Sequence, residues 1–206
     1  MITNDSEGPR VRRTQAERTE RTRSKLLESA ARGFSTYGYG NVRLDDIARD
    51  AGYTRGALYH LFANKDELAL AVIEWVQQTW QAEVGAPAGQ IDDPAERLVW
   101  AARAHARYVR KHIAAVLLSL RVEFAGRDHP VADALAQVIG PLTDDLAKTI
   151  TLGRRRGSLP PGPPPRLLAS AYIGVLEGVT SAVTGPPHDA DLTERAVRGL
   201  LGLPQS

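Results

Sequence analysis

Residues 44–61 read LDDIARDAGYTRGALYHL, and the spacing of their apolar and small residues decides the fold of the N-terminal region. Ala48 sits where two crossing helices touch most closely, and Gly52 sits at the turn, where the backbone favours a left-handed conformation. The apolar residues that would face a common core are Ile47, Ala51, Tyr53, Leu58 and Leu61. Together these positions predict a helix-turn-helix.

The second helix of such a unit lies in the major groove of DNA, so its outward residues are the candidate contacts. These outward residues are Thr54, Arg55, Gly56, Tyr59 and His60. Arg55, at the amino end, is placed to donate to guanine N7 and O6 or to a phosphate. A solvated surface role is the alternative for Arg55.

The neighbouring positions add to this predicted surface. Gly56 allows the helix backbone to approach DNA closely. Tyr59 offers a hydroxyl to phosphate and His60 offers a ring nitrogen to phosphate or a base, with ordinary amphipathic packing as the alternative for both. Lys65 begins the next helix, where free backbone N–H groups and the positive end of the dipole favour a phosphate.

Outside this motif the apolar residues are spaced by three and four, which predicts an all-α protein. The expected helices span residues 22–38, 44–51, 55–61, 65–83, 94–112, 114–126, 130–156, 166–184 and 190–202. The stretch GAPAG at 85–89 is the predicted domain boundary, and GSLPPGPPP at 157–165 is a predicted extended linker. The predicted units are a flexible basic arm (1–21), a DNA-binding domain (22–83) and a second helical domain (90–206).

The chain of 206 residues has a net charge of +2, but its basic residues are concentrated near the N-terminus. Residues 1–65 hold 12 basic and 8 acidic side chains, and seven of the basic ones lie between residues 10 and 25. This excess favours an anionic partner for the N-terminal part alone, with a solvated, disordered tail as the alternative.

Several classes of protein are disfavoured by what the sequence lacks. It has no cysteine, which excludes disulfides and thiol sites, and its five histidines lack the spacing of a metal site. It has no glycine-rich phosphate loop, so we expect neither an enzyme nor a cofactor. The polar N-terminus and the lack of about 18 consecutive apolar residues predict no signal peptide, no membrane span and a cytoplasmic location.

The stretch GYGNVRLDDIARDAGYTRGALYHLFANKDEL, residues 38–68, resembles the DNA-binding domain of TetR-family transcriptional regulators. The most specific shared residues are Gly56, Leu58, Tyr59, Phe62 and Lys65. The resemblance implies an all-α homodimer that binds a palindromic operator in double-stranded DNA and carries a small-molecule effector pocket in its C-terminal domain. It also implies that Thr54, Arg55, Tyr59, His60 and Lys65 contact DNA.

Two positions depart from the family pattern. Arg43 stands where a Ser or Thr usually caps the second helix and touches phosphate. Its longer cation can still reach phosphate, but the cap is lost. Leu61 stands where an aromatic residue is common, which predicts a small change in packing.

The C-terminal helices are expected to enclose the effector cavity, and by the resemblance the effector is small and partly apolar. The candidate lining residues are polar or aromatic side chains within apolar stripes: Trp100, His105, Tyr108, Glu123, Phe124, Gln137, Tyr172 and Glu177. Core packing or surface exposure is the alternative for each of them.

The last two helices carry small and apolar residues on one face, which predicts a four-helix dimer interface. The candidate residues are Ala171, Gly174, Val175, Gly178, Val179, Val197, Leu200 and Leu201. Gly174 and Gly178 lie four residues apart, so two backbones can approach closely there. Packing within the chain is the alternative.

With this resemblance, the hypothesis is a repressor that a ligand releases from its operator, and activation or ligand-aided binding is the alternative. Two other functions stay open: a non-specific, architectural DNA-binding protein, and a helical protein-interaction adaptor. A preference of about 10³ or more for one DNA sequence over random DNA separates a regulator from the first.

Overall fold

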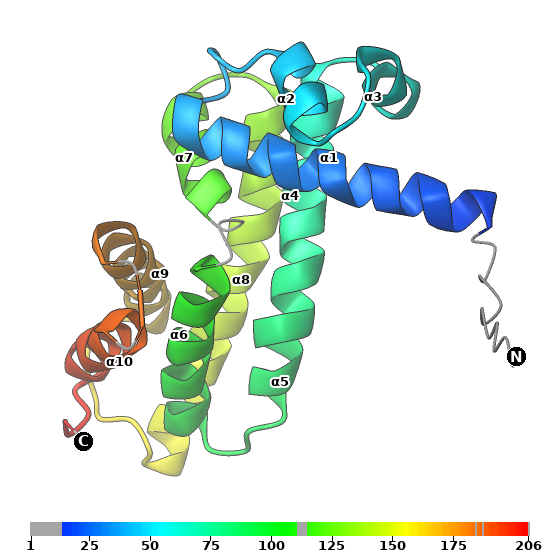
Figure 1. Cartoon of the computed structure of the whole chain (residues 1–206). Helices are drawn as coiled ribbons and strands as arrows, with labels where there is room; N and C mark the ends of the chain where they lie inside the picture. Colours follow the sequence, from blue (N-terminus) through cyan, green and yellow to red (C-terminus); the bar gives the residue numbers. More distant parts are fainter. Residues whose placement is uncertain (1–13, 111–114, 184, 187, 206) are drawn as a thin grey trace, which may run out of the picture.

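The computed structural model describes residues 14–110, 115–183, 185–186 and 188–205, and within these it contains helices and no strand (Figure 1). The elements are α1 (Gln15–Tyr37), α2 (Leu44–Asp50), α3 (Arg55–Leu61), α4 (Lys65–Trp80), the π-helical turn η1 (Gln81–Gly85), α5 (Ala86–Gly89), α6 (Pro94–Val109), α7 (Ala115–Phe124), α8 (Pro130–Arg156), α9 (Pro165–Ala182) and α10 (His188–Leu201). The predicted all-α class is confirmed. Across the described ranges no helix is both long and apolar enough to cross a membrane.

Helix α1 begins at Gln15 rather than near residue 22, so the last part of the predicted flexible arm is helical. The Thr14 hydroxyl accepts from the Glu17 N–H at 3.2 Å, and the Glu17 carboxylate accepts from the Thr14 N–H at 2.9 Å. This capping box satisfies two backbone donors and stabilises the first turn. Residues 1–13 of the predicted arm lie outside the described residues.

A first hydrophobic core joins α1–α4 to α7 and the beginning of α8. Its fully buried members include Leu26, Leu27, Phe34, Leu58, Leu68, Val72, Val116, Leu120 and Val131. The helix-turn-helix region therefore packs against two helices that were assigned to the C-terminal domain. The division of the chain at residues 85–89 is not a division of its packing.

The predicted break at residues 85–89 is a continued helix. After Trp80 the backbone widens into η1 and continues as α5, in which Pro87 occupies the first turn. A Cβ at Gly85 would lie 2.2 Å from Gln81 Oε1, so this glycine accommodates a close side chain. The connection to α6 comes later, where Asp93 accepts from the Glu96 N–H at 2.9 Å.

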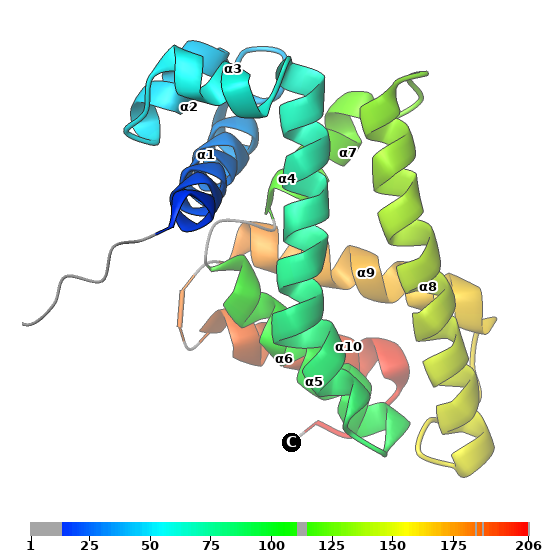
Figure 2. The same cartoon turned by 90° about the vertical axis from the view of Figure 1, so that its right-hand side faces the viewer.

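A second core lies between α6, the end of α8, α9 and α10. Its members include Leu98, Ala102, Ile150, Leu159, Leu168, Tyr172, Leu176, Val197 and Leu201. Helices α4 and α8 pack side by side, and α8, with 27 residues, reaches from the first core to the second (Figure 2). The predicted bounds of α8 are confirmed: it begins at Pro130 and ends before Gly157, whose φ is 79°.

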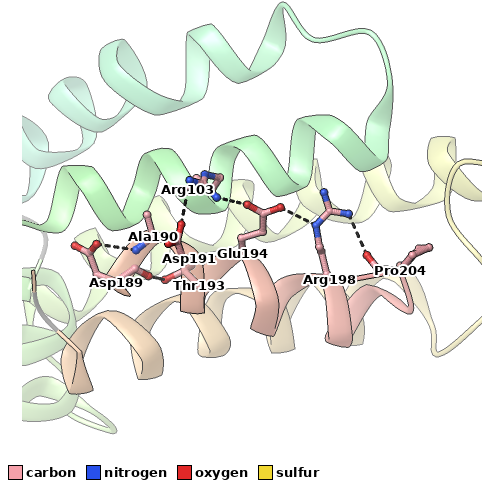
Figure 3. A network of polar contacts seen from close by, with 8 residues as sticks. All are labelled: Arg103, Asp189, Ala190, Asp191, Thr193, Glu194, Arg198 and Pro204. Carbon is pink, nitrogen blue, oxygen red and sulfur yellow. Dashed lines mark hydrogen bonds and ion pairs between the residues drawn. The ribbon is translucent and has the colours of Figure 1, made fainter. Parts of the chain in front are cut away.

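Ion pairs fix α10 against α6 (Figure 3). Arg103 of α6 pairs with Asp191 at 3.2 Å and with Glu194, which also accepts from Arg198 at 2.7 Å. This network and the second core turn Val197 and Leu201 inward, at 0% and 4% exposure. Their predicted place in a dimer interface is therefore wrong, because both side chains are already buried within the chain.

Candidate nucleic-acid interface and ligand cavity

The turn between α2 and α3 has the geometry that its sequence predicts. Gly52 has a φ of 78°, and a Cβ there would meet no atom within 4 Å, so backbone conformation rather than crowding favours glycine. Ala48 is 1% exposed, and its carbonyl accepts from the Tyr53 N–H at 2.8 Å. The structure confirms the predicted left-handed turn and close helix contact.

Helix α3 buries Leu58 and presents the other face to solvent. Thr54 caps the helix by accepting from the Ala57 N–H at 3.2 Å. Tyr59 is 40% exposed, and Gly56 and His60 are exposed too. Helix α3 lies at the top of the molecule in Figure 1, and its predicted contact residues are exposed.

Arg55 has partners within the protein. Its Nε lies 3.3 Å from Asp45 Oδ1, and its guanidinium stacks over the Tyr59 ring at 5.1 Å from the centroid. The side chain remains 66% exposed. Asp45 and Tyr59 hold the guanidinium at the surface without burying it, so its N–H groups stay within reach of an anion.

Gly56 has no steric reason for being glycine within this chain. A Cβ there would meet only Thr54 Oγ1, at 3.9 Å, which is ordinary contact. Alanine would also be the better helix former. The predicted close approach of DNA at Gly56 stays a prediction, and the lack of a steric need within the chain is compatible with it.

Arg43 and Lys65 differ in how free they are. Arg43 is exposed at the N-cap of α2 and makes no capping hydrogen bond there. Lys65 is partly buried, and its ammonium donates to the carbonyls of Tyr39 at 2.8 Å and Gly40 at 3.4 Å. Its charge therefore already stabilises the loop before α2, and a phosphate contact by Lys65 stays a prediction.

The same loop is held from the other side by α7. Glu123 accepts from the Tyr39 N–H at 2.6 Å and from the Gly40 N–H at 2.7 Å. Phe124 packs edge-on against the Tyr39 ring at 4.9 Å. Glu123 and Phe124 therefore join α7 to the helix-turn-helix region. Neither borders the cavity between the two cores, and Phe124 lines a second pocket between α7 and α8.

A cavity of about 340 Å³ lies between the two cores. Its walls come from α4, α6, α7, α8 and α9, and the lining is mainly apolar. The lining includes Trp80, His105, Tyr108, Asp145, Tyr172 and Glu177. The volume is at the lower end of the about 300–1,000 Å³ found for small-molecule sites.

Four of the predicted lining residues border this cavity: His105, Tyr108, Tyr172 and Glu177. Besides Glu123 and Phe124, the structure also places Trp100 and Gln137 elsewhere: Trp100 does not line the cavity, and Gln137 is exposed on α8. Trp80 was missed because it lies at the end of α4, in a segment assigned to the DNA-binding domain.

Both cavity tyrosines turn their hydroxyls away from the space. Tyr108 donates to the Val76 carbonyl at 3.1 Å, and Tyr172 donates to the Leu98 carbonyl at 2.7 Å. Burial raises the pKa of Tyr108 to about 12 and raises that of Tyr172 further. Their rings therefore contribute apolar wall, and their hydroxyls stabilise the packing of α4, α6 and α9.

His105 borders the cavity and makes one hydrogen bond through its ring. Trp80 Nε1 donates to His105 Nδ1 at 3.2 Å, which joins α4 to α6. Desolvation lowers the pKa of His105 to about 4, so its imidazole is neutral at pH 7.

The outward face of α9 carries small and apolar residues. Ala171, Gly174 and Gly178 are exposed, and Leu167 is 65% exposed. A Cβ at Gly174 or Gly178 would meet no atom within 4 Å. Val175, Val179 and Leu200 are partly buried, so this set of predicted interface residues keeps surface that a partner could cover.

Residues 26–72 match the family model described as bacterial regulatory proteins, tetR family. Over 176 residues, 85% of this chain, the sequence is 29% identical to the A-factor receptor protein of Streptomyces griseus, and the match spans 59% of that protein. The HTH-type transcriptional repressor BepR of Brucella suis is 29% identical over 155 residues, which cover 72% of this chain and 73% of BepR.

The fold is shared with solved structures. AibR in complex with isovaleryl coenzyme A and operator DNA matches with a TM-score of 0.75 and 22% identity, over 88% of this chain and 98% of AibR. This likeness covers both the helix-turn-helix region and the helices around the cavity.

Proposed function

Since the chain belongs to the TetR family of bacterial regulatory proteins, which are transcriptional regulators and not enzymes, we propose that it is a ligand-responsive repressor. It binds a palindromic operator as a homodimer and leaves it when a small, partly apolar effector occupies the cavity. BepR, a relative, is a transcriptional repressor, and AibR has been solved with both a small molecule and operator DNA. Both support this proposal.

The observation that carries the proposal is the open face of α3. Arg55, Tyr59 and His60 are exposed together around Gly56, and none of them is used in the core. A short helix that presents these groups beside a helix-turn-helix turn suits the major groove. Exposed Arg43 lies near the start of α2, where a phosphate would pass.

The path from cavity to DNA runs through α4 and α7. Trp80 of α4 and Leu117 of α7 both line the cavity. At the other end of these helices, Lys65 and Glu123 hold the two sides of the Tyr39–Gly40 loop. A ligand that favours one position of α7 relative to α4 would thereby shift the reading helix, and only such differential affinity changes the equilibrium.

The dimer is proposed on the outward face of α9. Two glycines in mid-helix cost about 1 kcal/mol each against alanine, and no contact within the chain requires them. A two-fold partner that packs its own α9 there would explain both. Such a dimer would space its two α3 helices for half-sites about 34–36 Å apart.

The test is selection from a randomised duplex DNA pool at about 150 mM salt. We expect an enriched inverted repeat with a preference of about 10³ or more over random DNA. Tyr59→Ala should abolish the enrichment. Tyr37→Ala is the control: it removes another exposed tyrosine, the last residue of α1, and should leave the enrichment unchanged. Binding without enrichment would favour an architectural protein, and no binding at all would favour an adaptor.

A further inference from the structure

The hydrogen bond from Trp80 fixes the tautomer of His105. An indole nitrogen can only donate, so His105 Nδ1 must accept and its proton must lie on Nε2. Within the described chain, Nε2–H has no acceptor, and the ring borders the cavity. The cavity wall therefore presents this N–H, besides the side-chain amides of Gln77 and Gln81, and a ligand must satisfy it or leave it unpaired.

Trp80 also keeps this donor neutral. A doubly protonated imidazole would point its Nδ1–H at the Trp80 Nε1–H, which places two donors face to face. Desolvation acts in the same direction and lowers the pKa of His105 to about 4. An incoming anion therefore cannot easily recruit a proton to this ring.

The other charges around the cavity are acidic and already paired. Asp145 lies 2.8 Å from Lys148 Nζ, and Glu177 pairs with Arg121. Among the described lining residues there is no Lys or Arg. A carboxylate would thus lose its hydration with no Lys or Arg among these described residues to compensate it, and a cation would meet a donor at His105 and two carboxylates that already have partners.

We propose that this cavity selects an uncharged, mainly apolar molecule with a carbonyl-type oxygen, which accepts from His105 Nε2–H, and that it rejects carboxylates and cations. This inference rests on the proposed function, because it names the chemistry of the effector site. His105 is the specificity-determining residue, and Trp80 is a positioning residue that sets its tautomer.

The test uses three probes with equal numbers of non-hydrogen atoms: methyl nonanoate, decanoate and undecylammonium. Binding to the full chain is measured by calorimetry near pH 7.4. We expect the ester to bind about a hundredfold more tightly than either ion, since an unpaired buried charge costs several kcal/mol. Equal or tighter binding of decanoate or undecylammonium, or no binding of the ester, would overturn the inference.

Variants of His105 and Trp80 test which side chain determines the preference for the ester. His105→Phe should weaken ester binding about tenfold, and His105→Gln, which keeps a donor, should restore part of it. Trp80→Phe frees His105 Nδ1 to take up a proton, so this variant should bind decanoate more tightly than the wild type does. Because a proton is taken up from the buffer, the enthalpy of decanoate binding should then differ between buffers. Trp100→Phe, on α6 but outside the cavity lining, is the matched control. If Trp80→Phe behaved like Trp100→Phe, the positioning role would be wrong.

A second readout does not depend on any variant's stability. Nitrogen chemical shifts of the wild-type protein should show His105 as the neutral Nε2–H tautomer, and an Nδ1–H tautomer or imidazolium would contradict the inference. Operator affinity is measured in parallel. Ester binding that leaves operator affinity unchanged would support the cavity chemistry and overturn the proposed effector role, whereas operator binding by a protein that ignores the ester would overturn this inference alone.

Discussion

At Gly56, alanine should favour folding, whereas glycine should favour DNA binding. Alanine there should raise the free energy of unfolding by about 0.5–1 kcal/mol, because it favours helix and its Cβ meets only Thr54 Oγ1 at 3.9 Å. On DNA the same methyl group would crowd the groove, so operator affinity should fall about tenfold, the lower end of overpacking costs. Urea denaturation and fluorescence anisotropy measure the two effects.

Gly89 provides the control for this substitution. It is exposed in α5, and a Cβ there would meet no atom within 4 Å. Gly89→Ala should therefore stabilise the fold with no effect on operator binding. If Gly56→Ala left operator affinity unchanged as well, the close approach inferred for α3 would be wrong.

His105 makes stability depend on pH in a defined window. Its pKa is lowered from 6.5 to about 4, so between these values the unfolded chain binds a proton that the folded chain does not. The free energy of unfolding should therefore fall as the pH falls from about 6.5 to 4, by about 3 kcal/mol in total. Urea denaturation at several pH values measures this slope.

His105→Gln should remove that part of the slope. The same slope in wild type and His105→Gln would show that other groups cause it. This outcome would also weaken the case for a neutral donor in the cavity.

At the scale of elements, local sequence signals predicted the helices well where they were strong. Pro130 and Gly157 bound α8 as expected, and Gly52 makes the predicted turn. The start of α1 was missed because Thr14 and Glu17 cap it within a basic, polar stretch that has no apolar stripe. The glycines at 85–89 read as a break, yet tertiary packing keeps that segment helical.

The Glu123 contact is where α7 acts on the DNA-binding region. Glu123→Gln keeps the shape of the side chain but leaves one of the two N–H groups, of Tyr39 or Gly40, facing an amide donor. We expect the free energy of unfolding to fall by about 1–3 kcal/mol. We also expect a ligand to change operator affinity less than it does in the wild type. Urea denaturation and operator titrations with and without ligand test both parts.

Asp128→Asn is the control, since Asp128 is an exposed carboxylate in the connection after α7. It should change neither quantity. If Glu123→Gln lowered the free energy of unfolding but left the ligand's effect on operator affinity unchanged, Glu123 would have a structural role alone.

For the whole molecule, the cavity could be predicted only in part from the sequence. Apolar stripes identified α6 and α9, and with them His105, Tyr108 and Tyr172, as facing inward. They could not show that Phe124 turns to the Tyr39 loop, or that Trp80 of α4 reaches the cavity. Those outcomes depend on how α4, α7 and α8 pack across the two cores, which no single helix encodes.

The α9 face leads to a prediction about assembly. In a two-fold interface each subunit contributes one copy of every substitution. Gly174→Glu would therefore place two charged side chains where the two α9 backbones should meet. The protein should become monomeric at concentrations at which the wild type is a dimer, and operator affinity should fall because each half-site is then bound alone. The fold itself should not suffer, since a Cβ at Gly174 meets no atom within 4 Å and glutamate is the better helix former. Sedimentation velocity measures the mass, Gly89→Glu on α5 is the control that should stay dimeric, and a Gly174→Glu dimer would move the interface away from this face of α9.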